Sequence, residues 1–135
     1  MGIVGLDKVL VDTSAWIEFF RKREPHFGAV ATLIDEDRIC CVGLVLAELI
    51  QCAKSEKELK VFSDFPSVFA FLPEDARLWA EAGRLSRMLR GKGRTIGLSD
   101  CFIAAAAISA DVSVYTLDAH FESIRKAGAV RLYGK

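Results

Sequence analysis

The alternation of short, fully apolar segments with amphipathic ones most constrains how this chain folds. Strands are expected at 8–11, 38–42, 68–72, 113–117 and 129–133, and helices at about 14–23, 27–37, 44–60, 73–90, 98–110 and 119–127. Apolar strands of this length, alternating with helices, are typical of a parallel sheet that is covered on both faces. We therefore expect an α/β fold with a mostly parallel central sheet of about five short strands, flanked by helices on both faces.

Length and charge limit the class of protein. A chain of 135 residues with 52% hydrophobic residues is expected to form one domain, over residues 1–135. Its apolar runs are shorter than the roughly 20 residues that a membrane-spanning helix needs, and no secretion signal is visible, so we expect a cytoplasmic protein without a membrane segment. Eighteen basic and eighteen acidic residues cancel, so net charge does not indicate nucleic-acid binding.

The cysteines and histidines do not indicate a zinc site. The four cysteines lie in apolar segments without C-x-x-C spacing, and we expect them to be buried free thiols: Cys40, Cys41, Cys52 and Cys101. The two histidines, His26 and His120, are too isolated in the sequence to act as a pair.

Two aspartates follow expected strands. Asp12 comes at the end of the first strand, and Asp118 comes directly after the strand at 113–117. Ligands of open α/β sheets bind at the carboxyl ends of the strands, so both side chains are candidates for one site. The alternative is that each carboxylate only caps the helix that follows it.

Two further acids lie on apolar helices. Glu48 is surrounded by apolar residues, and a buried carboxylate needs a proton, a cationic partner such as arginine, or a metal ion. Asp100 opens the apolar helix at 98–110, where the helix dipole favours a carboxylate, and a purely structural Asp100 with Ser99 as the helix cap is the alternative.

Four carboxylates gathered at one site repel one another unless a cation is bound. Oxygen ligands suit Mg²⁺ or Mn²⁺, so the expected metal ligands are Asp12, Glu48, Asp100 and Asp118. Such ions activate water and stabilise charge during phosphodiester cleavage. The sequence therefore indicates metal-dependent phosphodiester hydrolysis.

The motifs around these acids also match a known family. In chain order they are Val11-Asp12-Thr13-Ser14, Ala47-Glu48-Leu49, Ser99-Asp100 before Ile103-Ala104-Ala105, and Thr116-Leu117-Asp118-Ala119-His120-Phe121. Their order and spacing resemble a PIN domain, most of all the VapC-type toxins of toxin–antitoxin pairs, over essentially the whole chain. One departure is Gly97, because family members commonly carry a proline shortly before the aspartate.

The resemblance implies a Mg²⁺- or Mn²⁺-dependent endoribonuclease whose acidic residues are Asp12, Glu48, Asp100 and Asp118. The motifs do not show which of these acids bind the ion directly; we favour Asp12 and Asp100 as direct ligands, with Glu48 and Asp118 supporting one or both ions. The resemblance implies hydrogen-bonding roles at the site for Ser14 and Thr116. It also implies a VapB-type antitoxin as partner, RNA as substrate, and a homodimer.

Basic residues form a possible phosphate track near Asp100. They recur along one helix and the loop after it, at Arg84, Arg87, Arg90, Lys92 and Arg94. The alternative is a solvated helix face whose cations also favour the carboxyl end of the helix.

Other functions remain open at this point. A close alternative is a PIN nuclease with a housekeeping role in RNA processing. A different class is a phosphoaspartate protein, but a phosphatase of the haloacid dehalogenase type needs an aspartate where this chain has Ser14, and a signalling receiver needs a lysine after the strand that ends at Leu117. A non-catalytic RNA-binding module is a third alternative, although all four acids are present.

Overall fold

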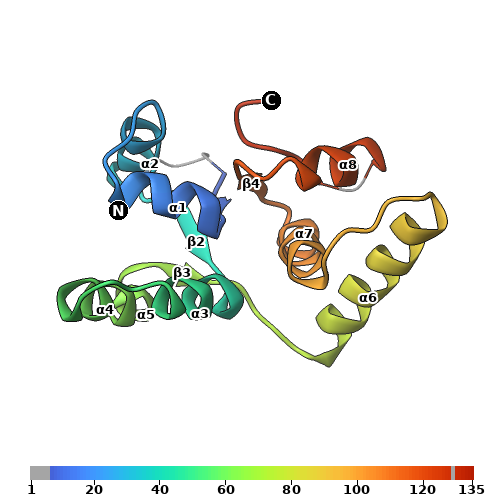
Figure 1. Ribbon diagram of the computed structural model, residues 1–135, viewed down its shortest axis with the longest axis horizontal. Helices are drawn as coiled ribbons and strands as arrows, with labels where there is room; N and C mark the ends of the chain where they lie inside the picture. Colours follow the sequence, from blue (N-terminus) through green and yellow to red (C-terminus); the bar gives the residue numbers. More distant parts are fainter. Residues whose placement is uncertain (1–6, 129) are drawn as a thin grey trace.

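A computed structural model describes residues 7–128 and 130–135 and confirms the α/β class (Figure 1). Its sheet runs in the order β3-β2-β1-β4, and every neighbouring pair is parallel. The strands are β1 (Val9–Val11), β2 (Ile39–Cys41), β3 (Ala70–Phe71) and β4 (Ser113–Tyr115). Strands far apart in the sequence, β1 and β4, therefore lie side by side.

The central strand β1 shows why these segments are apolar throughout. Leu10 pairs with Cys40 of β2 on one side and with Val114 of β4 on the other. All three β1 side chains are fully buried, because helices cover both faces of the sheet. The chain leaves β1 at Asp12, at the carboxyl edge that it shares with β4.

Within the described residues, eight helices flank the sheet: α1 (Thr13–Phe20), α2 (His26–Asp35), α3 (Gly43–Gln51), α4 (Glu56–Ser63), α5 (Phe65–Val68), α6 (Ala76–Gly91), α7 (Leu98–Ala110) and α8 (His120–Lys126). In Figure 1, α1 to α5 lie toward one side of the molecule, and α6, α7 and α8 toward the other. Helix α1 packs on α2 and α3, and α7 packs on α6, α8 and β4.

Helix α7 is the buried centre of its side of the molecule. Its residues 101–107 are all buried, and four consecutive alanines let neighbouring helices approach closely. Phe102 stacks on Trp79 of α6 with the ring centroids 3.9 Å apart. No helix in the described ranges, α7 included, is long and apolar enough to cross a membrane. The burial of α7 fixes the position of Asp100 in its first turn.

The single helix expected at 44–60 is wrong, because the chain breaks it into α3 and α4. Ser55 adopts an extended backbone conformation, and its hydroxyl accepts a hydrogen bond from the Glu58 backbone N–H at 3.1 Å. The Glu58 carboxylate in turn accepts from the Lys54 backbone N–H at 2.8 Å. Ser55 and Glu58 have the spacing of a capping box, a helix-start signal that outweighs the continuous helical pattern.

The remaining strand predictions are too long. The stretch expected at 68–72 is a strand only over β3, because its first residue closes the short helix α5. Of the strand expected at 129–133, residue 129 lies outside the described residues, and Leu132 makes an isolated parallel bridge with Val114. The described sheet therefore has four strands rather than five.

Three of the four cysteines are buried as expected, but Cys52 is exposed at the end of α3, where the helix stops.

Candidate active site

Asp12 is a buried carboxylate at the junction of β1 and α1. Only 4% of its surface is exposed. Its Oδ1 accepts hydrogen bonds from the Ser14 hydroxyl at 2.6 Å and the Ala15 backbone N–H at 3.2 Å, and its Oδ2 accepts from the Thr116 hydroxyl at 2.6 Å. Burial raises the pKa of Asp12, the nearby Asp118 charge adds to this, and the three donors oppose it. Asp12 does cap α1, as one alternative held, but the cap uses only one of these contacts.

The loop after β4 is held against this junction. The strand ends at Tyr115 rather than at 117, and the Tyr115 carbonyl accepts from the Asp12 backbone N–H at 3.0 Å. Beyond it, the Leu117 backbone N–H donates to the Ser14 hydroxyl oxygen at 2.9 Å, and the Asp118 N–H donates to the Thr116 hydroxyl oxygen at 3.0 Å. Asp118 is therefore positioned by contacts with the first strand's end, although it lies 106 residues away in the sequence.

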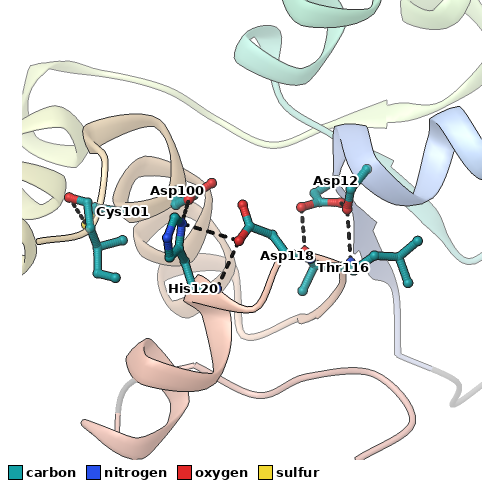
Figure 2. A network of polar contacts seen from close by, with 9 residues as sticks. Asp12, Asp100, Cys101, Thr116, Asp118 and His120 are labelled. Atoms are coloured by element: carbon teal, nitrogen blue, oxygen red, sulfur yellow. Dashed lines mark hydrogen bonds and ion pairs between the residues drawn. The ribbon is translucent and has the colours of Figure 1, made fainter. Parts of the chain in front are cut away.

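Asp118 meets Asp100 and His120 beside this junction (Figure 2). One oxygen of the Asp118 carboxylate accepts from the His120 backbone N–H at 2.9 Å. The His120 Nδ1 lies 3.3 Å from the Asp100 Oδ2 and 3.3 Å from the Asp118 Oδ1. One ligand atom from each of the three side chains falls within 4.8 Å of the others, a grouping able to hold a metal ion. In Figure 2 the Asp118 side chain lies between this group and Asp12.

Asp100 is partly exposed, and its surroundings strongly perturb its pKa. Its pKa is raised from 3.8 to about 6, first because of burial and then because of the Asp118 charge, and the contact with His120 opposes the increase. The structural alternative with Ser99 as the helix cap is wrong, because α7 begins at Leu98 and Gly97 occupies the cap position without a side-chain bond. A bound cation would offset the repulsion between like charges that contributes to this raised pKa.

Glu48 stands one step further from the cluster. It is half-buried on α3 rather than deeply buried, so the strong burial expected from its apolar neighbours is wrong. Its Oε1 accepts a hydrogen bond from the Thr13 hydroxyl at 2.7 Å. No arginine forms an ion pair with Glu48 in the part of the chain that the structure describes. Thr13 follows Asp12 directly, so Glu48 is connected to the site by one intervening side chain.

The structure thus brings five of the six expected site residues into one hydrogen-bonded group: Asp12, Ser14, Asp100, Thr116 and Asp118. Sequence reasoning missed His120 and Thr13. His120 does not pair with His26, which instead contacts the Tyr115 hydroxyl at 2.8 Å. The signal for His120 was its place two residues after Asp118, at the start of a helix.

The five expected RNA-contacting residues lie on α6 and the loop after it. Arg84 pairs with Glu81 at 3.2 Å, and Arg94 donates to the Ser123 hydroxyl at 3.1 Å. Arg87, Arg90 and Lys92 are exposed. Exposure suits both a phosphate track and an ordinary solvated face.

Asp100, Asp118 and His120 form a group of two carboxylates and an imidazole that could hold a metal ion, beside the carboxyl edge of the parallel sheet. The family model described as "PIN domain" matches residues 9–127. The chain belongs to the PIN-domain family. This membership excludes the phosphoaspartate alternatives that were considered for Asp12.

Individual relatives narrow the assignment. Ribonuclease VapC1 of Methanocaldococcus jannaschii is 28% identical over 130 residues, covering 95% of this chain and 88% of that protein. The solved structure of DNA-bound VapBC from Salmonella typhimurium matches with a TM-score of 0.72 and 26% identity over 94% of this chain and 97% of that one. A Mycobacterium tuberculosis member of the VapBC family of toxin–antitoxin systems matches with a TM-score of 0.67, 24% identity and coverages of 94% and 98%. The protein is a ribonuclease of the VapC type.

Proposed function

We propose that this ribonuclease cleaves RNA phosphodiester bonds internally, and that a divalent cation, Mg²⁺ or Mn²⁺, is bound by Asp12, Asp100 and Asp118. The observation that carries the proposal is the approach of Asp118 to Asp100 in one group of ligand atoms, where burial first and then the Asp118 charge raise the pKa of Asp100. Ionised acids that lie this close together repel one another, and a divalent ion bound between them removes that repulsion. The oxygen-rich donor set fits such an ion.

Each side chain then has a distinct task. A bound divalent ion supplies water activation and neutralises the negative charge that develops on the phosphate. Ser14 and Thr116 orient the Asp12 carboxylate through two short hydrogen bonds. Glu48 accepts a hydrogen bond from the hydroxyl of Thr13, the residue after Asp12, and we propose that it acts on the ion through water. The remaining acids, Asp100 and Asp118, provide oxygens that lie within 4.8 Å of each other.

The mechanism is tested by a nuclease assay on wild type, Asp100→Asn and a control, Asp35→Asn. Asp35 is exposed near the end of α2. Wild type and Asp35→Asn are expected to cleave RNA with Mg²⁺ or Mn²⁺ and to stop in EDTA, and Asp100→Asn is expected to lose at least about 100-fold in rate, since a missing ligand weakens ion binding and activation. Equal activity of Asp100→Asn, or activity in EDTA, contradicts the proposal.

We further propose that RNA phosphates bind along Arg84, Arg87, Arg90, Lys92 and Arg94. On an Asp100→Asn background, Arg87→Glu is expected to weaken RNA binding and to reduce its dependence on salt, because one counterion-releasing contact is lost. Lys57→Glu, an equal charge change on exposed α4, is the control. Equal loss in both variants points to net charge alone and contradicts a track on α6.

We also propose a VapB-type antitoxin as partner and a homodimer as the assembly, since a VapBC structure and a VapBC-family member are among the similar structures. Aromatic side chains of the first helices offer an apolar surface for a partner segment: Phe19 and Phe20 are only partly buried, and Phe19 stacks on Phe27 with ring centroids 5.2 Å apart.

Expression of the protein alone is expected to arrest growth. Co-expression of the product of a neighbouring gene is expected to relieve the arrest, and that product is expected to co-purify with the protein and to inhibit the nuclease. A protein that expresses without toxicity and has no such partner favours a housekeeping role. Light scattering tests the dimer.

A further inference from the structure

His120 is the one non-acidic side chain in the group that it forms with Asp100 and Asp118, and both its backbone and its ring contact Asp118. It is the first residue of α8, and its backbone N–H donates to the Asp118 carboxylate at 2.9 Å. Its ring turns back toward the same carboxylate, although 57% of the side chain is exposed to solvent. An exposed histidine at a helix start is free to point outward, so its inward orientation requires an explanation.

Hydrogen bonding alone explains this orientation poorly. The Nδ1 atom lies 3.3 Å from Asp100 and 3.3 Å from Asp118. Both distances exceed the roughly 2.7–2.9 Å that is typical of a nitrogen–carboxylate bond between charged groups. A single Nδ1–H also cannot point directly at two oxygens on different residues.

The same distances fit three ligand atoms around a common point. Ligands lie about 2.1 Å from an octahedrally bound Mg²⁺, so neighbouring ligand atoms are separated by about 3 Å. The two nitrogen–oxygen separations are close to that edge length, and all three ligand atoms fall within 4.8 Å of one another.

We infer that His120 is a direct ligand of the active-site cation through its Nδ1, together with Asp100 and Asp118; this rests on the proposed metal-dependent function. The neutral imidazole, with its hydrogen on Nε2, presents a lone pair at Nδ1. Imidazole is a poorer ligand for Mg²⁺ than oxygen is, and it binds first-row transition metals well. His120 therefore shifts the selectivity of the site from Mg²⁺ toward Mn²⁺.

The chain suits a direct spectroscopic test, because it contains two histidines in all. Mn²⁺ is added to protein without a histidine tag, and electron spin-echo envelope modulation detects the coupling between bound Mn²⁺ and a ligand ¹⁴N. The coupling is expected in wild type and in His26→Asn, and it is expected to disappear in His120→Asn. The asparagine variant keeps an N–H donor near the position of Nδ1. It therefore preserves a role of His120 that consists only of hydrogen bonding.

Cation affinities give a second, independent measurement. By titration calorimetry, His120→Asn is expected to weaken Mn²⁺ binding about tenfold or more and Mg²⁺ binding less than about threefold, since only the nitrogen-preferring ion loses its favoured ligand. His26→Asn is expected to change neither affinity.

Four outcomes contradict the inference, and the last of them also contradicts the proposed function. Mn²⁺ that binds without ¹⁴N coupling, or a coupling that persists in His120→Asn, shows that His120 is not a ligand and leaves the metal-dependent function standing. Equal losses of Mn²⁺ and Mg²⁺ affinity contradict the selectivity. Absence of Mn²⁺ binding to wild type overturns the proposed function as well.

Discussion

The carboxylate of Asp12 is stabilised in the fold by two hydroxyl groups. The Ser14 and Thr116 donors each bond one of its oxygens at 2.6 Å, and the buried position leaves little access to water. Removing one donor leaves a buried acceptor unsatisfied, which costs more than an average hydrogen bond contributes. The Thr116 hydroxyl also accepts from the Asp118 backbone N–H, so its loss affects both acids.

Thr116→Val is therefore expected to destabilise the protein by about 1–3 kcal/mol, because valine keeps the shape but neither bond. Urea unfolding at pH 7 measures the change. Thr32→Val is the matched control, since the exposed Thr32 hydroxyl bonds only a carbonyl within α2, and we expect about 0.5 kcal/mol or less from it. Equal effects of the two substitutions would falsify a special role for Thr116.

Asp100 makes the metal-free fold pH-sensitive. Its pKa in the folded protein is about 6, raised from 3.8, so between these values the folded state binds more protons than the unfolded state does. Stability from this group is accordingly fully present below about pH 3.8 and is lost as pH rises through about 6, above which the penalty of the ionised carboxylate stays constant.

Asp100→Asn removes this penalty. In EDTA at pH 7 it is expected to stabilise the protein by on the order of 1 kcal/mol, a value reduced from the full pKa shift because the side chain is partly solvated, and to have little effect near pH 4.5. Urea unfolding at both pH values measures this, with Asp35→Asn as the control. A gain that is the same at both pH values contradicts the assignment to Asp100 ionisation.

At the level of elements, sequence patterns located the helices and strands more accurately than their ends. Period and apolarity identify β1, β2 and α7 because burial on all sides leaves a continuous apolar run. The ends depend on individual hydrogen bonds, and a continuous helical pattern across Ser55 conceals the break between α3 and α4. Such a break is visible in the sequence only through the spacing of Ser55 and Glu58.

The break between α3 and α4 leads to a prediction about the free energy of unfolding. Ser55→Ala removes the hydroxyl that caps α4 and is expected to lower the free energy of unfolding by about 1 kcal/mol. Exposed Ser67 on α5 provides a control, and Ser67→Ala is expected to change stability by about 0.5 kcal/mol or less. Thermal unfolding of both variants, followed by circular dichroism, is the measurement. If Ser55→Ala is no less stable than Ser67→Ala, the cap does not hold the helix boundary.

For the whole molecule, the site joins segments that are distant in sequence: the end of β1, the start of α7 and the connection from β4 to α8. Parallel-sheet geometry made Asp12 and Asp118 predictable, because both follow strands that end at one edge. Asp100 was predictable from its place before an apolar helix. The orientation of the His120 ring and the Thr13 contact to Glu48 were not, since they depend on how helices pack, which no local pattern encodes.

A cation that bridges these segments is expected to stabilise the entire fold. At a concentration about 100 times its dissociation constant, Mn²⁺ is expected to add roughly 2.7 kcal/mol at pH 7.5 and progressively less below about pH 6, where Asp100 takes up a proton. Differential scanning fluorimetry with and without EDTA measures the shift, and Asp100→Asn is expected to lose most of it. A full shift in Asp100→Asn places the stabilising ion elsewhere.

The connection from Tyr115 to His120 has a consequence for how the gene tolerates change. Within six residues it supplies a carbonyl and a hydroxyl to Asp12, an imidazole to Asp100, and a carboxylate to its own backbone. Surface loops commonly accept insertions and deletions, and the exposed turn between α6 and α7 has that freedom. The short connection before α8 does not, because one added or missing codon shifts every donor after it out of register. Among natural variants of this gene, we expect this loop to keep its length and to keep Thr116, Asp118 and His120, whereas Leu117 and Ala119 are free to differ.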